Sequence, residues 1–228
     1  MLQPPARHPA FVLLCALLPE AVAVMGGLAA WRLAEKGATS RPGRVHLVGM
    51  GPRRARMAAG RLASSLPDGL PVVVMGVGGA LTGGYVPGDL VVATALGMAE
   101  VSDRSDLEVS VEPVALNETS AELSDRLAAE LELFKVHRVP LLSAERTARG
   151  EEREALHAAS GAVICDTESA WLARLADRRP FAVIRTVVDT PERELMSLGT
   201  LTGGVAGLRR LEQAAHVVAG CLSASRPA

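Results

Sequence analysis

Residues Ala162–Asp189 read AVICDTESAWLARLADRRPFAVIRTVVD, with an apolar run at each end of a helical pattern. The runs at 162–165 and 180–188 are almost continuously apolar, which is typical of short strands whose two faces are both covered. The segment 168–176 between them has helical spacing. A strand, a helix and a second strand in succession predict a layered α/β fold.

The same alternation continues through the rest of the chain. It predicts a single domain in which helices cover both sides of one sheet, over residues 10–222, with disordered tails at 1–9 and 223–228. The other expected strands are 11–17, 44–48, 71–77, 89–95 and 139–143, and the other expected helices are 20–34, 53–65, 120–133, 151–159 and 204–222.

The composition excludes several classes of function. Lys and Arg number 24 against 25 Asp and Glu, a balance that provides no basic surface for nucleic acid or for an anionic membrane. Aromatic residues make up only 3%, too few for a base-stacking platform. The cysteines, Cys15, Cys165 and Cys221, are far apart, and neither they nor the histidines show metal-binding spacing. We therefore expect a reduced cytoplasmic protein without a metal or an organic cofactor.

The N-terminal segment imitates a secretory signal, because Arg7 precedes an apolar run and the small residues at 21–23 resemble a cleavage site. Pro19 and Glu20 interrupt the run, which is then too short to cross a bilayer, so we expect no stable membrane insertion. Cleavage at this site would also remove the expected first strand. Retention in the cytoplasm is the favoured interpretation, and secretion is the alternative.

Three carboxylates stand just beyond expected strands, at Glu20, Glu168 and Asp189. Ligands of open α/β sheets bind at the carboxyl ends of strands. One strand–helix–strand unit separates Glu168 from Asp189, so we expect both at the same edge of the sheet. The alternatives are a first-turn acid stabilised by the helix dipole for Glu168 and a helix start or turn for Asp189. Burying an isolated Glu20 in such apolar surroundings is costly unless the carboxylate is paired, protonated or hydrated. Taken together, the three acids therefore indicate that they line one pocket.

Two glycine-rich turns also follow expected strands. In MGVGGALTGG, Gly76, Gly78 and Gly79 either let backbone N–H groups approach a ligand closely or form a tight loop between core strands. The spacing fits neither a dinucleotide-binding motif nor a P-loop. In GMGPRRAR, Arg53 and Arg54 could meet a phosphate, but a solvated first turn of a helix is the alternative.

Four segments, taken in order, resemble the purine nucleoside phosphorylase and methylthioadenosine/adenosylhomocysteine nucleosidase superfamily. LLCALLPEAVAV resembles its first strand and glutamate, and LVGMGPRRA resembles its S-G-I-G-K-type turn. MGVGGALTGGYVPGDLVV resembles its G-x-A-G-G-L…GD-x-V segment, and DTESAWLA…PFAVIRTVVD resembles its E-M-E…PF-x-x-x-R-x-x-S-D segment. The resemblance implies a three-layer α/β/α domain with a central mixed sheet, and a homodimer.

The resemblance also implies a role for each acid. Asp189 would be the general acid at N7 of a purine, which requires burial to keep it protonated near neutral pH. Glu168 would accept hydrogen bonds from the ribose 2′- and 3′-hydroxyls, and Glu20 would prepare the attacking water. The remaining substrate-binding positions would be Thr167, Gly76, Val77, Gly78 and Gly79.

Several positions depart from the superfamily pattern. Val188 replaces the serine that usually precedes the acid, and Val77 stands where a serine often meets phosphate or nucleophilic water. Thr167 replaces the methionine usually packed under the ribose, and Thr147 stands where an aromatic residue commonly contacts the base. These differences indicate a different substrate, or a weak or lost activity.

Within the superfamily, the D-x-E-S variant and the tail VVDTPERELMSLGTLTGGVAGLRRL most resemble actinobacterial phosphorylase-like proteins associated with hopanoid biosynthesis. This predicts N-glycosidic cleavage of an adenosyl compound with release of adenine, the substrate being adenosylhopane, a lipid-linked nucleoside. The alternatives are a purine nucleosidase or phosphorylase of nucleoside salvage, of the methylthioadenosine or adenosylhomocysteine type, and a catalytically silent nucleoside-binding relative. The sequence does not decide whether the nucleophile is water or inorganic phosphate, which would then be a co-substrate. Arg53, Arg54 and Arg185 are the candidate phosphate ligands.

Overall fold

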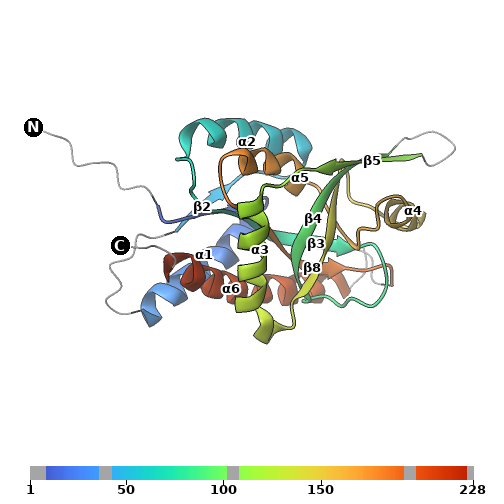
Figure 1. The fold of residues 1–228 in the computed structure, drawn as a ribbon. Helices are drawn as coiled ribbons and strands as arrows, with labels where there is room; N and C mark the ends of the chain where they lie inside the picture. Colours follow the sequence, from blue (N-terminus) through green and yellow to red (C-terminus); the bar gives the residue numbers. More distant parts are fainter. Residues whose placement is uncertain (1–8, 36–42, 102–107, 193–198, 225–228) are drawn as a thin grey trace, which may run out of the picture.

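The computed structural model describes residues 9–35, 43–101, 108–192 and 199–224. Strands and helices alternate over most of these residues (Figure 1). The strands are β1 Val12–Cys15, β2 Arg44–Leu47, β3 Val72–Ala80, β4 Leu90–Val101, β5 Val109–Val114, β6 His137–Ala144, β7 Ile164–Asp166 and β8 Phe181–Asp189. The helices are α1 Leu18–Ala34, α2 Pro52–Ser65, α3 Glu118–Glu130, α4 Glu151–Ser160, α5 Ser169–Leu172 and α6 Gly199–Ala224, with short 3₁₀ turns η1 Glu132–Phe134 and η2 Ala173–Asp177.

The strands form one mixed sheet in the order β2-β1-β3-β7-β6-β4-β5, and β8 pairs with both β3 and β4. Strand β3 is parallel to β8 but antiparallel to β7, while β4 is parallel to β6 and antiparallel to β8. Because β6 also pairs with β7, the strands β3, β8, β4, β6 and β7 close into a ring. The expected mixed sheet is confirmed, and its closure is an addition to the prediction.

Helices cover the sheet from two sides, as predicted. In Figure 1, α2 and α5 lie above the sheet, whereas α1 and α6 lie below it. The lower layer packs Val24 and Leu28 of α1 and Ala215 of α6 with apolar strand side chains in one core cluster. A second cluster joins α2 and α5 to the opposite faces of the strands. The three-layer α/β/α prediction is therefore confirmed.

Four local expectations need correction. Strand β5 was not predicted, because VSVEPV alternates apolar and polar residues and contains a proline, as suits an exposed edge strand. Strand β3 extends to Ala80 instead of ending at residue 77, so the first glycines lie in a strand and not in a loop. The helix expected at 168–176 is split into α5 and η2. Helix α6 reaches Ala224, two residues beyond the expected end of the domain.

The N-terminal apolar run forms the buried strand β1, between β2 and β3, and the first turns of α1. Cleavage after residue 23 would remove β1 together with Glu20. Among the described residues, no helix combines the length and apolarity that a bilayer span requires.

The contact between α1 and α6 depends on a glycine. A Cβ at Gly27 would lie 2.2 Å from the backbone oxygen of Glu212 and 2.8 Å from Cβ of Ala215. We expect Gly27→Ala to lower the free energy of unfolding by about 1–3 kcal/mol, because the two helices would have to separate. The matched control is Gly60→Ala in α2, where nothing lies within 4 Å of the added Cβ. Urea unfolding should show that Gly60→Ala is more stable than the unmodified protein by about 0.5–1 kcal/mol. Equal effects of the two substitutions on stability would contradict the close contact between α1 and α6 at Gly27.

Candidate active site

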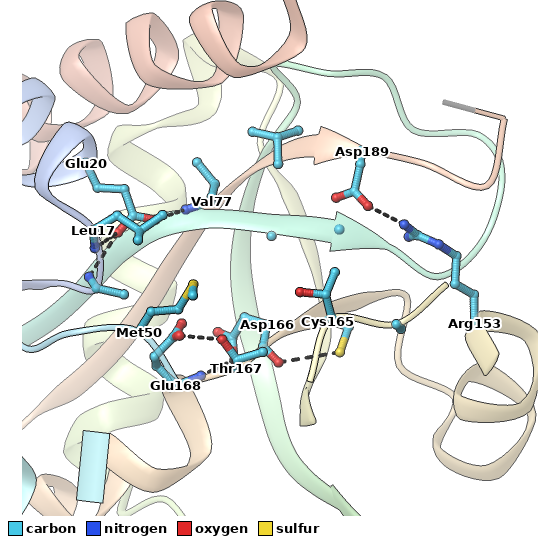
Figure 2. Close-up of a pocket in the computed structure, with 16 residues that line it drawn as sticks. Leu17, Glu20, Met50, Val77, Arg153, Cys165, Asp166, Thr167, Glu168 and Asp189 are labelled. Atoms are coloured by element: carbon cyan, nitrogen blue, oxygen red, sulfur yellow. Dashed lines mark hydrogen bonds and ion pairs between the residues drawn. The ribbon is translucent and has the colours of Figure 1, made fainter. Parts of the chain in front are cut away.

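One pocket of about 200 Å³ contains all three predicted acids (Figure 2). It lies where the end of β1, the glycine-rich half of β3, and the ends of β7 and β8 approach one another. In Figure 2, Asp189 is at one end of the pocket, and Glu20 and Glu168 are toward the other. Its lining residues are Ala16, Leu17, Glu20, Met50, Val77, Gly78, Gly79, Thr147, Ala148, Arg153, Cys165, Asp166, Thr167, Glu168, Val188 and Asp189.

Glu20 lies in the first turn of α1 and is 2% exposed. The backbone N–H groups of Ala16 and Leu17 donate to its Oε2 atom at 2.9 and 2.8 Å. The N–H of Val77 in β3 donates to Oε1 at 2.8 Å. These three hydrogen bonds offset the free-energy cost of burying the Glu20 carboxylate in an apolar region, and they fix the carboxylate at the pocket wall.

Glu168 is the N-cap residue of α5, but its side chain makes no capping hydrogen bond, and Asp166 accepts from the backbone there instead. Oδ1 of Asp166 accepts from the backbone N–H groups of Glu168 and Ser169, both at 3.1 Å. The Glu168 side chain instead reaches the turn before α2, where the N–H of Gly51 donates to Oε1 at 2.8 Å. The hydroxyl of Thr167 donates to the same oxygen. The alternative of a simple first-turn acid therefore does not describe Glu168.

A buried ion pair lies behind Glu168. Nε of Arg185 donates to Oδ2 of Asp166 at 2.8 Å, and Nη2 of Arg185 is 2.6 Å from the same oxygen. Nη2 also lies 3.7 Å from Oε2 of Glu168. Burial by itself would raise the pKa of Asp166, but Arg185 and hydrogen bonds from Ser143 and Ser169 outweigh it and hold that pKa below its usual range. For Glu168 burial prevails over the opposing Arg185 and raises the pKa.

Asp189 ends β8 and forms an ion pair with Arg153 of α4, both side chains being 2% exposed. Arg153 also donates to the carbonyl of Ala80 at the end of β3. Asp189 therefore neither starts a helix nor faces solvent as a turn residue. The pairing also differs from the expectation that burial alone would keep Asp189 protonated, since an adjacent guanidinium favours the ionised carboxylate.

The glycines of β3 leave room for charged side chains. A Cβ at Gly76 would lie 2.2 Å from Nη1 of Arg185 and 2.7 Å from Oε1 of Glu20. At Gly79 it would lie 2.7 Å from Oδ1 of Asp189. Glycine inside a strand typically marks such close approaches. Gly78 and Gly79 line the pocket as predicted, whereas Gly76 lies outside the set of lining residues.

The structure separates the predicted phosphate ligands from the pocket. Arg53 and Arg54 are exposed in the first turn of α2 and do not line it. Arg185 is fully buried behind the lining residues and is engaged by Asp166. The departures Val77, Thr147 and Val188 all line the pocket, as does Thr167.

Two charged residues of the site were not predicted. Asp166 stands two residues before Glu168, and the D-x-E spacing was the signal that could have indicated it. Arg153 gave no signal, because an arginine in the acidic helix EEREALHAAS reads as a solvated side chain. Cys165 lines the pocket, but burial raises its pKa well above the ordinary value, so its thiol stays neutral. In the described part of the chain, no cluster of three or more His, Cys, Asp or Glu side chains is arranged to hold a metal ion.

The sequence matches the phosphorylase superfamily over residues 29–204. A search of curated proteins finds no match.

Solved structures share the fold. Futalosine hydrolase of Helicobacter pylori strain 26695 is 16% identical with a TM-score of 0.67, covering 93% of this chain and 96% of its own. The 5′-methylthioadenosine/S-adenosylhomocysteine nucleosidase of Neisseria meningitidis, in complex with methylthio-immucillin-A, is 17% identical with a TM-score of 0.67, covering 92% and 98%. A putative nucleosidase of this type from Borrelia burgdorferi B31, bound to adenine, is 13% identical with a TM-score of 0.70, covering 91% and 98%. With its sequence matched over most of its length, the chain belongs to the phosphorylase superfamily.

Proposed function

We propose that this protein hydrolyses the N-glycosidic bond of an adenosyl compound and releases adenine. The observation that carries the proposal is the placement of three buried carboxylates from distant segments around one pocket, with Asp189 at one end and Glu20 and Glu168 toward the other. The similar solved structures include nucleosidases and a hydrolase, one of them bound to adenine.

Each acid has a distinct task in this reaction. Asp189 gives a proton to N7 of the purine while the C–N bond breaks and its electron pair leaves with the base. Glu168 accepts hydrogen bonds from the ribose hydroxyls and stabilises the positive charge that develops on the sugar. Glu20 takes a proton from the water that attacks the anomeric carbon. The products are adenine and the free sugar, and solvent restores both carboxyl groups.

The charges of the pocket favour water over phosphate. Its ionisable lining side chains include the carboxylates of Glu20, Asp166, Glu168 and Asp189 against the single guanidinium of Arg153, which is already paired. A phosphate dianion would meet Glu20 directly, whereas phosphate sites normally offer arginine and backbone N–H donors. Here the N–H groups of Leu17 and Val77 are used by Glu20 itself.

Adenosylhopane is the proposed substrate. Leu17 and Met50 line the end of the pocket remote from Asp189. Met50 is 59% exposed, and Leu18, which follows Leu17 in the chain, is 63% exposed. Exposed apolar side chains next to a pocket suit an apolar substituent that continues out of the site. We further propose that the protein is a cytoplasmic homodimer, which light scattering of the purified protein would test.

The test is release of free adenine, measured by chromatography, from adenosine, methylthioadenosine and a long-chain 5′-alkyl adenosine, each with and without inorganic phosphate. We expect release without phosphate and the highest kcat/KM for the alkyl compound. A preference for methylthioadenosine would favour the salvage alternative, and a requirement for phosphate would refute hydrolysis. Binding of adenosine without cleavage of any compound would leave a silent nucleoside-binding protein.

A further inference from the structure

Arg153 is the one arginine among the described residues that line the pocket, and it contacts the proposed acid directly. It is the third residue of α4 and follows the loop whose Thr147 and Ala148 also line the pocket. Its guanidinium joins the end of β8, through Asp189, to the end of β3, through the carbonyl of Ala80. The side chain is thereby fixed at two points and is withdrawn from solvent.

Arg153 is placed to influence the charge of Asp189, because the two side chains form a buried ion pair. An opposite charge in contact with a carboxylate favours its ionised form, and the effect is large where water is scarce. The other carboxylates near the pocket act in the opposite direction, Arg185 is held by Asp166, and Arg146 pairs with Glu152. Among the described residues, these carboxylates are Glu20 of α1, Glu152 of α4, Asp166 of β7, Glu168 before α5 and Glu192 in the turn after β8.

We propose that Arg153 is a positioning residue that aims Asp189 and keeps its carboxyl group ionised in the free protein. Its effect on proton transfer to N7 rests on the proposed function. When protonated Asp189 gives its proton to N7, the carboxylate that forms again is stabilised by Arg153, whose own charge does not change. Arg153 therefore makes Asp189 a stronger acid and at the same time reduces the fraction of molecules in which Asp189 holds a proton at neutral pH.

These two effects predict that the basic limb of the enzyme's pH–rate profile lies at lower pH than it would without Arg153. Without the guanidinium, Asp189 would retain its proton to higher pH and would transfer it less readily. Arg153→Met should therefore move the basic limb of the pH–rate profile to higher pH while lowering the maximal rate. Arg153→Lys keeps the positive charge and should keep the limb near its original position. A residue with only a structural role would lower activity at every pH without moving the profile.

The primary test does not depend on catalysis. The Asp189 carboxyl is titrated by ¹³C NMR in protein with labelled aspartate, with its signal assigned by its absence from Asp189→Asn. We expect its midpoint to rise by at least about one pH unit in Arg153→Met and in Arg153→Gln, and to stay near the original value in Arg153→Lys. Arg149→Met, which changes an exposed arginine just before α4, is the matched control and should leave the midpoint unchanged.

The outcomes separate this inference from the proposed function. An unchanged midpoint in both folded neutral variants overturns the role of Arg153, whether or not the protein releases adenine. A raised midpoint in a protein that cleaves no nucleoside supports the electrostatic role and refutes the proposed function. Two neutral variants are used so that poor folding of one, seen by circular dichroism, still leaves the other to decide.

Discussion

Asp189→Asn should lower the rate of adenine release by about 10²–10⁴-fold, the usual contribution of a general acid. The amide has nearly the same shape as the carboxyl group but cannot give a proton to N7. Adenine would then have to leave without protonation, which raises the barrier for breaking the C–N bond. Nucleoside binding should change less, because Glu168 still holds the sugar.

The measurement is kcat/KM for the best substrate together with the dissociation constant of adenosine. Asp177→Asn, at the exposed end of η2, is the matched control and should behave like the unmodified protein. Because Arg153 loses its charged partner in Asp189→Asn, circular dichroism should first show that the variant is folded. Retention of the full rate in a folded variant would show that Asp189 is not the acid.

Asp166→Asn should lower the free energy of unfolding by about 3–5 kcal/mol, the usual cost of removing one partner of a buried ion pair. The guanidinium of Arg185 is fully buried, and Asp166 is the carboxylate nearest to it. Without that charge the guanidinium stays in the interior without full compensation. The double variant Asp166→Asn with Arg185→Met removes both charges and keeps an amide oxygen for the N–H groups of Glu168 and Ser169. It should be more stable than Asp166→Asn alone in urea unfolding.

The contribution of Asp166 to the free energy of unfolding should also depend on pH. Its pKa is lowered on folding from the ordinary 3.8, so its contribution to stability is fully present above 3.8. That contribution is lost as the pH falls through the lowered native value. The difference in stability between the unmodified protein and Asp166→Asn should therefore be constant above 3.8 and shrink below it. A difference that stays constant in acid would mean that the ionised form of Asp166 is not what stabilises Arg185.

The elements with continuous apolar runs were predictable because burial on both faces leaves a strong local pattern. Strands β1, β3 and β8 were found on this basis, within a few residues at their ends, and the longer helices of both layers were found from their helical spacing. The edge strand β5 was missed, because its alternating sequence and its proline reflect a partner strand that the local pattern does not reveal. The extension of β3 through Gly78 and Gly79 was missed for a related reason. Those glycines are in a strand only because β7 and β8 both pair there.

The meeting of the acids was expected for a partly wrong reason. Glu168 and Asp189 were assigned to one edge of a sheet on the basis of a strand–helix–strand unit. In the structure β7 runs antiparallel to β3 and β8 runs parallel to it, and both strands pair with the same stretch of β3. Cys165 and Asp189 pair with opposite sides of the same residue, Gly79. The shared pairing with β3, and not the order of elements along the chain, brings the two acids to one pocket.

The amino-acid sequence by itself determined the layers of this protein and the identity of its three acids, because burial periodicity and residue type are local properties. Only the tertiary structure decided which charges meet. The sequence around Arg153 predicts a solvated helix, yet Arg153 is buried against Asp189, and Arg185 pairs with Asp166 and does not line a phosphate site. Electrostatic partners depend on through-space distances between remote segments, and no local pattern encodes those distances.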